Sequence, residues 1–301
     1  MQNNQTKLPE AIKRISNENM DSLLGKPFNV LDAGFIRVID YMGDQSSIVQ
    51  AARVSYGLGT ESASTDEKLI RYLMRHRHTT PFEMCEIKLH VKLPIFVARQ
   101  WVRHRTASIN EYSARYSILA REFFIPDVEL LGKQSTANKQ GRGDSYSEQD
   151  ARWISQYMNN QAEANFDMYD YLISDAYDLA RETARQVLPL STYTEWYWKT
   201  DLHNLLHFCK LRADPHAQEE IRKYAMVIES IILKWMPVVF QAYLDYIKTA
   251  KTFSYNELIL LRELVAVIGF SKCKEVIELH PVWNLMSKRE QKEFLGNLEV
   301  Q

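Results

Sequence analysis

Residues 99–116 read RQWVRHRTASINEYSARY, and this stretch concentrates the polar chemistry of the chain. It holds four arginines, one histidine, one glutamate, one asparagine, one glutamine and two serines, but no lysine. A solvated surface helix usually mixes lysine with glutamate at helical spacing. Arginine instead carries a planar fork of N–H donors that fits phosphates and carboxylates. The composition therefore predicts a segment that binds anions.

The residues before this stretch predict a helix that presents it. Pro94 can open a helix, because its missing N–H would be unpaired at the first position anyway. On such a helix Gln100, Arg103 and His104 lie at i, i+3 and i+4 and share one side. Arg105 points about a quarter-turn beyond His104, so one helix end can address two different anions.

The clearest strand lies just upstream of this helix, at residues 85–93. Apolar residues alternate there with charged or polar ones, as in a strand with one face in the core. Residues 106–115 have the composition of a loop. Further strands or extended segments are expected at residues 35–41, 116–124 and 192–198.

Helical patterns occupy much of the rest of the chain. The helices are expected at residues 47–54, at 69–73 behind a Ser64–Glu67 capping box, from 148 to 187, from Asp201 to Leu211, from Asp214 toward Trp235 and at 257–267. The helix over 148–187 carries apolar residues on several faces, which predicts burial against neighbours or another subunit. Residues 132–150 are polar and predict a loop or insertion. Together these elements predict an α/β (α+β) protein with a mixed sheet and long helices.

Composition sets outer limits on function. With 301 residues, of which 46% are hydrophobic, the chain can bury a sizeable core. Its formal net charge of −1 argues against nucleic-acid binding through overall charge. Its three cysteines show no CxxC spacing and fit a reduced, cytoplasmic setting. The first residues lack the apolar core of a signal peptide, and no apolar run is long enough to predict a membrane span.

The segment RHRTASINEYSAR at 103–115 resembles the signature of the flavin-dependent thymidylate synthases. Supporting matches follow in the family's order: AARVSYG at 51–57, HTTPFE at 78–83, PIFVARQW at 94–101, ARQVLPLS at 184–191 and LRADPHAQEEI at 211–221. The resemblance implies a thymidylate synthase-complementing-like fold over residues 27–250 and a homotetramer whose sites are shared between subunits. Residues 1–26 are polar and patternless and are expected to form a weakly ordered arm, and residues 251–301, where the resemblance fades, are expected to form a C-terminal helical extension.

The same resemblance implies an activity, its cofactor and its partners. Deoxyuridine monophosphate (dUMP) is methylated reductively to deoxythymidine monophosphate (dTMP). Methylenetetrahydrofolate supplies the carbon, and NADPH reduces the cofactor FAD. No nucleic acid and no membrane is expected as a partner.

The family's binding residues carry over position by position. The expected dUMP contacts are Gln100, Arg103, Glu111, Tyr112, Ser113, Ala114, Arg115, Arg185 and Arg212. The expected FAD contacts are Ser55, His78, Thr80, Glu83, Arg103, His104, Arg105, Asn110, Glu111, Asp201, His203 and His207. Arg212 is the expected catalytic residue, because its family counterpart favours the N3-deprotonated uracil ring and so makes C5 a better nucleophile.

Each of these positions also has a plainer interpretation. Arg103 to Arg105 can form a structural ion-pair cluster, Ser113 can be a turn residue, and Arg181 with Arg185 can form a solvated helix stripe. Arg212 can be a cation that complements a helix end. A nucleic-acid-binding module and a relative with a changed substrate are the rival functions.

Histidines and cysteines raise two further alternatives. His76 and His78 lack a third ligand at useful spacing, so no metal site is expected. His203, His207 and Asp201 depart from the residues frequent in the family. Neither Cys85, on the core face of its strand, nor Cys209, within a helix, has the setting of an activated thiol.

Overall fold

The computed structural model describes residues 15–54, 65–136 and 141–298. Five strands form one sheet in the order β1-β2-β3-β7-β4, and every pair of neighbouring strands is antiparallel. The strands are β1 Pro27–Val30, β2 Gly34–Met42, β3 Glu86–Pro94, β4 Ser108–Glu111 and β7 Tyr193–Asp201. The α/β class is confirmed, but the expected mixed sheet is wrong.

Strand β3 lies at the centre of the sheet and confirms the alternation in its sequence. Ile87, Leu89, Val91 and Leu93 are at most 1% exposed, while the residues between them are half-buried. The register with β7 places Leu89 opposite Trp198. This side of the sheet forms the main apolar core.

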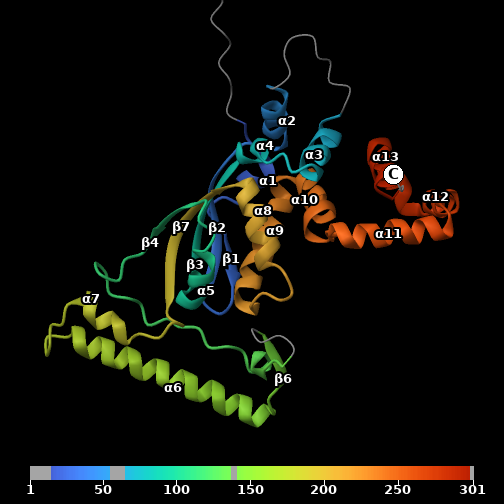
Figure 1. Cartoon of the computed structure of the whole chain (residues 1–301). Helices are drawn as coiled ribbons and strands as arrows, with labels where there is room; N and C mark the ends of the chain where they lie inside the picture. Colours follow the sequence, from blue (N-terminus) through green and yellow to red (C-terminus); the bar gives the residue numbers. More distant parts are fainter. Residues whose placement is uncertain (1–14, 55–64, 137–140, 299–301) are drawn as a thin grey trace, which may run out of the picture.

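Helices near the core fix the ends of these strands. They are α1 Glu18–Asp21, α2 Gln45–Arg53, α3 Asp66–Arg75, α4 Thr80–Glu83, α5 Ile95–Trp101, α8 Leu202–Arg212, α9 Glu219–Trp235 and α10 Pro237–Tyr243. Figure 1 shows α8 and α9 side by side beside the sheet. Among the described residues, no helix has both the length and the apolar character needed to cross a membrane.

The N-terminal residues that the structure describes belong to the core. Met20 in α1 is fully buried and Leu23 is 6% exposed. The expected weakly ordered arm is therefore wrong for residues 15–26, and residues 1–14 lie outside the described residues. Ser64 of the expected capping box also lies outside them, and Thr65 occupies the N-cap of α3 without a side-chain hydrogen bond.

The expected helix over residues 148–187 is two separate parts. Helix α6 spans Glu148–Ile173 and is followed by α7 Arg181–Ala184 and the short helix η2 Arg185–Val187. Ser174 ends α6 because its backbone is extended and its hydroxyl donates to the Tyr171 carbonyl at 2.7 Å. Phe166 and Tyr169 of α6 pack on Ala184 in a second, smaller core. Figure 1 shows α6 and α7 together at the edge of the molecule.

Several other boundaries differ from the sequence-based expectation. Residues 106–115 are not only a loop, since β4 lies within them, and residues 116–124 form no strand beyond an isolated bridge from Phe123 to Thr192. Around the polar stretch at 132–150, the structure has a 3-10 helix η1 Val128–Leu130 and a hairpin of β5 Gly132–Gln134 and β6 Arg142–Ser145. Helix α9 begins at Glu219, because Asp214 instead accepts a hydrogen bond from the His216 amide in a turn.

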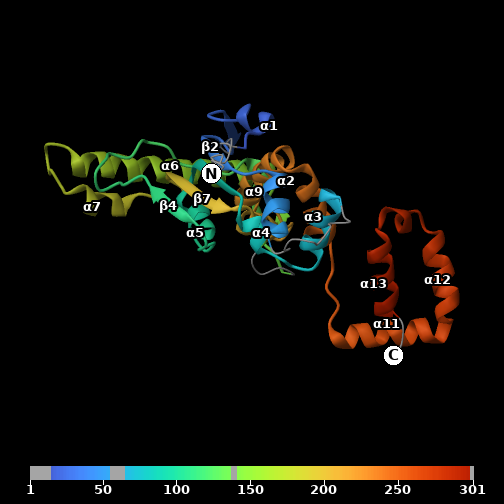
Figure 2. The same cartoon turned by 90° about the horizontal axis from the view of Figure 1, so that it is seen from above.

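The residues after α10 form a helical C-terminal extension. Its elements are η3 Leu244–Lys248, α11 Tyr255–Ile268, α12 Phe270–Leu279, η4 Pro281–Leu285 and α13 Lys288–Leu298. Figure 2 shows α11 leading away from the sheet and α13 lying beside α12. Ser254 and Glu257 form a capping box at the start of α11, which confirms the helix expected near residues 257–267.

Candidate functional site

The end of α8 meets the residues that follow α5. Arg212, the last residue of α8, donates from Nε to Nε2 of His104 at 3.0 Å. Its Nη2 donates to the Gln100 carbonyl, also at 3.0 Å. The expected helix face of Gln100, Arg103 and His104 is wrong, because α5 ends at Trp101 and a turn follows. Arg212 therefore links Gln100 and His104, which helical spacing was expected to bring together.

His104 is neutral in this setting. Burial lowers its pKa most, Arg212 and His207 lower it further, and the result is about 4. Because Nε2 accepts the hydrogen bond from Arg212, we assign the imidazole proton to Nδ1. His104 thus holds the guanidinium in place without adding a positive charge.

A hollow of about 350 Å³ opens beside this pair. Its lining residues are Arg103, His104, Arg105, Thr106, Trp198, Thr200, Asn204, His207, Leu211 and Arg212. Within the described part of the chain, no carboxylate forms an ion pair with Arg103, Arg105 or Arg212. Three cations around one hollow without acidic partners attract an anion.

The electrostatics of Arg212 reflect this crowding of positive charge. Burial lowers its pKa most, and the nearby Arg103 lowers it further. A guanidinium has five N–H donors, and two of those of Arg212 bind His104 and Gln100. The remaining three are available to an anionic ligand.

A second hollow of about 100 Å³ adjoins the first across His207, which lines both. Its lining residues are Leu73, Met74, Arg77, His78, Thr79, Phe82, His203, Leu206, His207, Lys210 and Ile247. Burial lowers the pKa of His207 most, followed by His203 and Lys210. Thr80 and Glu83 lie on α4, which packs on α8. Three of the expected FAD contacts, His78, His203 and His207, thus gather here.

Several of the expected dUMP contacts lie at the other end of β4. The Tyr112 amide donates to the Glu195 carbonyl at 2.8 Å, and the Ser113 hydroxyl accepts from the Arg115 amide at 3.3 Å. Arg115 forms an ion pair with Glu182 of α7 at 3.0 Å, and Arg185 follows in η2. Ser113, Ala114 and Arg115 therefore form a group of their own, and the ion pair joins it to α7, which Arg185 follows.

The sheet register measures the separation of the two groups. Thr200 of β7 donates to the Thr106 carbonyl at 2.9 Å, and Glu195 of β7 receives the Tyr112 amide. At about 3.4 Å per strand residue, these two points are roughly 17 Å apart. The lining of the Arg212 hollow accordingly includes none of Ser113, Ala114, Arg115 and Arg185.

The remaining predicted residues have local roles or intermediate positions. Glu111 accepts a hydrogen bond from Thr194 at 2.7 Å, and Gln100 donates to the Gln218 side chain at 2.5 Å. Asp201 caps α8, with its two carboxylate oxygens bound to Asn204 at 2.9 and 2.8 Å. Asn110 is exposed on the edge strand β4. Ser55 lies outside the described residues.

The plainer alternative for Arg181 and Arg185, a solvated stripe on one long helix, does not hold. Arg181 lies in α7 and donates to the Tyr116 carbonyl at 2.8 Å, while Arg185 lies in the following turn of 3-10 helix. The chain leaves the helical path after Ile173, so the spacing of four residues does not place the two guanidinium groups on one long helix.

The hollow is also lined by Trp198, Thr200 and Asn204, which were not among the residues predicted from the sequence. Asn204 precedes His207 by three residues on α8, and this spacing was a usable signal. Trp198 and Thr200 could not be predicted as lining residues, because the alternation in β7 indicates which residues are buried but not which end of the strand borders a site. The buried Trp198 Nε1 has no hydrogen-bond partner among the described residues.

The cysteines behave as packing residues. Cys85 and Cys209 are buried. Burial, followed by Asp44, raises the pKa of Cys85 to about 12, and burial raises that of Cys209 well above its usual range. Thiols with raised pKa values are poor nucleophiles at neutral pH. In the described ranges, no three His, Cys, Asp or Glu side chains form a group that could hold a metal ion.

Comparison with known proteins gives consistent relatives. Residues 37–238 match the family model described as thymidylate synthase complementing protein. Two relatives named flavin-dependent thymidylate synthase come from Ehrlichia ruminantium (strain Gardel) and Wolbachia pipientis wMel. The first is 51% identical over 262 residues, covering 87% of this chain and 88% of the relative. The second is 55% identical over 256 residues, covering 85% and 89%.

A solved structure extends the comparison to three dimensions. It is the UMP/dUMP methylase PolB from Streptomyces cacaoi, bound with 5-Br UMP. Its TM-score is 0.66 at 32% identity, and the match covers 74% of this chain and 100% of that one. A second structure of that methylase, bound with 5-Br dUMP, gives a TM-score of 0.65.

Proposed function

This chain belongs to the thymidylate synthase complementing protein family and is, with its relatives, a flavin-dependent methyltransferase that makes dTMP from dUMP; from that premise we propose its cosubstrates and the roles of its residues. Methylenetetrahydrofolate supplies the carbon, and NADPH supplies the reducing equivalents. FAD, when bound, carries the hydride that completes the methyl group.

One observation carries the assignment of residues. Arg103, Arg105 and Arg212 surround a hollow without a carboxylate partner in the described chain, and His104 beside them is neutral. Arg121, by contrast, is compensated by three carboxylates at 2.6 to 2.8 Å. The uncompensated cluster supports binding of anionic ligands.

Arg212 is the catalytic residue in this proposal. Three of its N–H groups have no acceptor among the residues that the structure describes, while His104 and Gln100 hold the other two. A fixed guanidinium favours a uracil ring that has lost its N3 proton, and the negative charge then makes C5 a stronger carbon nucleophile. This preorganised charge acts as an oxyanion hole does. No cysteine thiolate is needed to activate C5.

The residues around the two hollows fit a flavin. Arg103 and Arg105 offer donors to oxygen atoms or a diphosphate, and His78, His203 and His207 offer flat polar rings beside apolar side chains. These residues, with His104, Thr80 and Glu83, would hold FAD. The protein's contribution is placement and charge, whereas the cofactor supplies the redox chemistry.

The dUMP phosphate is assigned to Ser113, Ala114, Arg115 and Arg185. The separation of roughly 17 Å along β7 supports a site shared between two chains, where one supplies the hollow and another the loop. Helix α6 supports the same assembly, since Trp153 is 67% and Tyr157 60% exposed although the two rings stack. We propose that a homotetramer covers this aromatic face and completes the sites.

The test is a reconstitution with single omissions. Purified protein is expected to show the yellow absorption of bound flavin and to form dTMP from dUMP, NADPH and methylenetetrahydrofolate. Omission of any one component is expected to stop product formation. A colourless protein that gains no flavin on incubation with FAD and binds generic RNA with steep salt dependence would instead support a nucleic-acid-binding module.

A further inference from the structure

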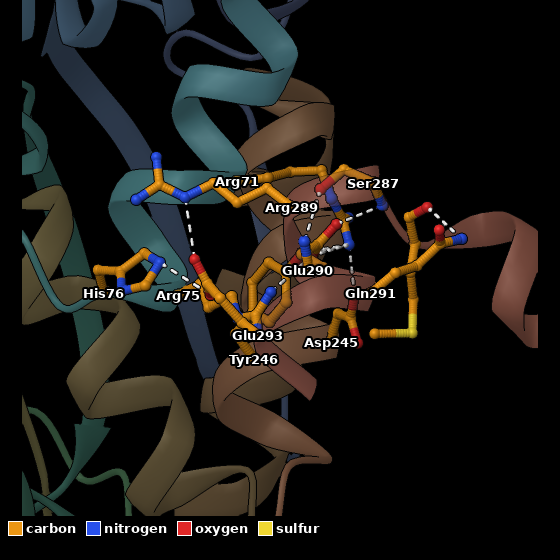
Figure 3. Close-up of polar contacts among 11 residues, drawn as sticks. Arg71, Arg75, His76, Asp245, Tyr246, Ser287, Arg289, Glu290, Gln291 and Glu293 are labelled. Atoms are coloured by element: carbon orange, nitrogen blue, oxygen red, sulfur yellow. Dashed lines mark hydrogen bonds and ion pairs between the residues drawn. The ribbon is translucent and has the colours of Figure 1, made fainter. Parts of the chain in front are cut away.

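Helix α13 of the C-terminal extension contacts the core through charged side chains. Glu293 lies 3.2 Å from Arg75 and 3.4 Å from Nε2 of His76, and Glu290 lies 3.9 Å from both Arg71 and Arg75. Figure 3 shows these residues of α13 facing the C-terminal half of α3.

The contact is polar rather than apolar, which makes it directional. The buried residues of α13 are Glu290 and Gln291, and α11 and α12 contain no buried residue. Gln291 donates to the Trp283 carbonyl at 2.7 Å, which ties α13 to η4. A buried carboxylate tolerates displacement poorly, because it must keep its charged and hydrogen-bonding partners. The network thus holds α13 in one position on α3.

One path leads from this network to His78. The Arg289 guanidinium lies over the Tyr72 ring, with Cζ 4.2 Å from the centroid. The Tyr72 ring is in turn 4.4 Å from the His76 ring and 5.7 Å from the His78 ring. His78 lines the smaller hollow. Arg289 therefore packs on the ring against which His78 rests.

A second path reaches the same hollow through Tyr246. Its hydroxyl donates to Glu290 and accepts from Arg71 at 2.6 Å. Its carbonyl accepts from Arg77 at 3.4 Å, and the next residue, Ile247, lines the hollow together with Arg77. Both paths begin on α13 and end at lining residues.

We propose that Arg289, Glu290 and Glu293 are positioning residues for flavin binding, because they fix His78 through Tyr72 and another part of the wall of the hollow through Tyr246. The inference rests on the proposed function in one respect, the assignment of His78 to the flavin site. It gives the C-terminal extension, which follows the segment matched by the family model, a role in that site.

The experiment is a double-mutant cycle on FAD affinity, measured by fluorescence titration of the intact protein. Arg289→Ala is expected to weaken FAD binding roughly fivefold, as loss of a cation–π contact does. Arg289→Lys keeps a cation over Tyr72 and is expected to restore most of the affinity. Lys292→Ala, an exposed position of the same helix, is the matched control and is expected to leave affinity unchanged.

The cycle separates positioning from general stabilisation. If Arg289 acts through His78, Arg289→Ala in a His78→Ala background is expected to cause little further loss of affinity. The visible spectrum of the bound flavin is expected to shift in Arg289→Ala and to return in Arg289→Lys. If Arg289→Ala does not fold, Glu293→Gln tests the same path with nearly unchanged volume, because Glu293 accepts a hydrogen bond from Nε of Arg289 at 2.9 Å.

Two outcomes overturn the proposal and can be told apart. FAD affinity at the wild-type level in Arg289→Ala and Glu293→Gln, or fully additive losses with His78→Ala, would remove the positioning role while leaving the proposed function intact. Wild-type protein that binds no FAD, or His78→Ala with unchanged affinity, would overturn the flavin assignment of His78 and the inference with it.

Discussion

Replacing Arg212 by alanine removes the only group that we assign to stabilising the uracil anion. The change deletes two hydrogen bonds, to His104 and to the Gln100 carbonyl, and removes a guanidinium that lines the hollow. Loss of one preorganised donor at a developing anion typically costs about 2.7–4 kcal/mol. We therefore expect kcat for dTMP formation to fall on the order of a hundredfold or more, while FAD remains bound.

The plainer role of Arg212, a helix-end cation, makes a different prediction. Such a cation contributes about 0.3–1 kcal/mol to stability and nothing specific to turnover. Lys234 in the last turn of α9 is the matched control, so Lys234→Ala is expected to retain full activity. Turnover is measured at saturating cosubstrates with the flavin content determined for each protein. Near-wild-type kcat in a flavin-loaded Arg212→Ala protein would refute the catalytic role.

The same variant also changes the pKa of its neighbour. Burial is the larger cause that holds the pKa of His104 at about 4, and Arg212 is the next. Removing the guanidinium is therefore expected to raise this pKa while leaving it below the usual range, which NMR titration of the imidazole can follow. An unchanged pKa would show that the two side chains are not in contact in solution.

Three other predictions follow from the remaining features. His104→Ala is expected to weaken FAD retention, measured after gel filtration, and unchanged occupancy would count against its place in the flavin site. Replacement of Cys85, Cys209 and Cys273 together is expected to lower stability by about a kcal/mol or more without abolishing dTMP formation. If the variant is folded and flavin-loaded but inactive, and one restored cysteine rescues it, a thiolate takes part. Burial raises the pKa of Glu293, but its hydrogen bond and charge interactions with arginines outweigh burial and hold this pKa below the usual range. The contribution of Glu293 to α13 docking is therefore present above the pKa of the unfolded state. It is lost as pH falls through the lower pKa of the folded state. Hydrogen exchange across α13 at decreasing pH would reveal that release, and protection that persists under acid would contradict it.

The elements that could be predicted from the sequence are those determined by local residue patterns. Alternation defined β3, and Asp201 marked the start of α8 because its carboxylate caps the helix locally. The end of α5 was missed because tertiary contacts compete there with helical propensity. Trp101, for example, ends α5 with its ring 4.4 Å from Phe208 and 5.3 Å from Trp198. No local spacing predicts such a contact.

Strand β4 shows the same limit at the site itself. Its four residues are all exposed, and their polar sequence is typical of a loop. They form a strand because the open edge of β7 offers backbone donors and acceptors. The strand in turn carries the chain from the Arg212 hollow to the Ser113 loop, so the separation of the two groups was not predictable without the register.

The presence or absence of a carboxylate partner distinguishes arginines that residue type alone does not distinguish. Arg103, Arg105 and Arg212 have no carboxylate partner within the described chain, whereas Arg115 is paired with Glu182. That pair is exposed, at 55% and 56% for the two side chains, and such pairs contribute only about 0.2–1 kcal/mol. A phosphate dianion that also receives the Ser113 hydroxyl and loop amides offers Arg115 a stronger, charge-assisted partner. The ion pair with Glu182 therefore does not oppose the phosphate assignment that we propose, because its replacement by a phosphate would cost little energy.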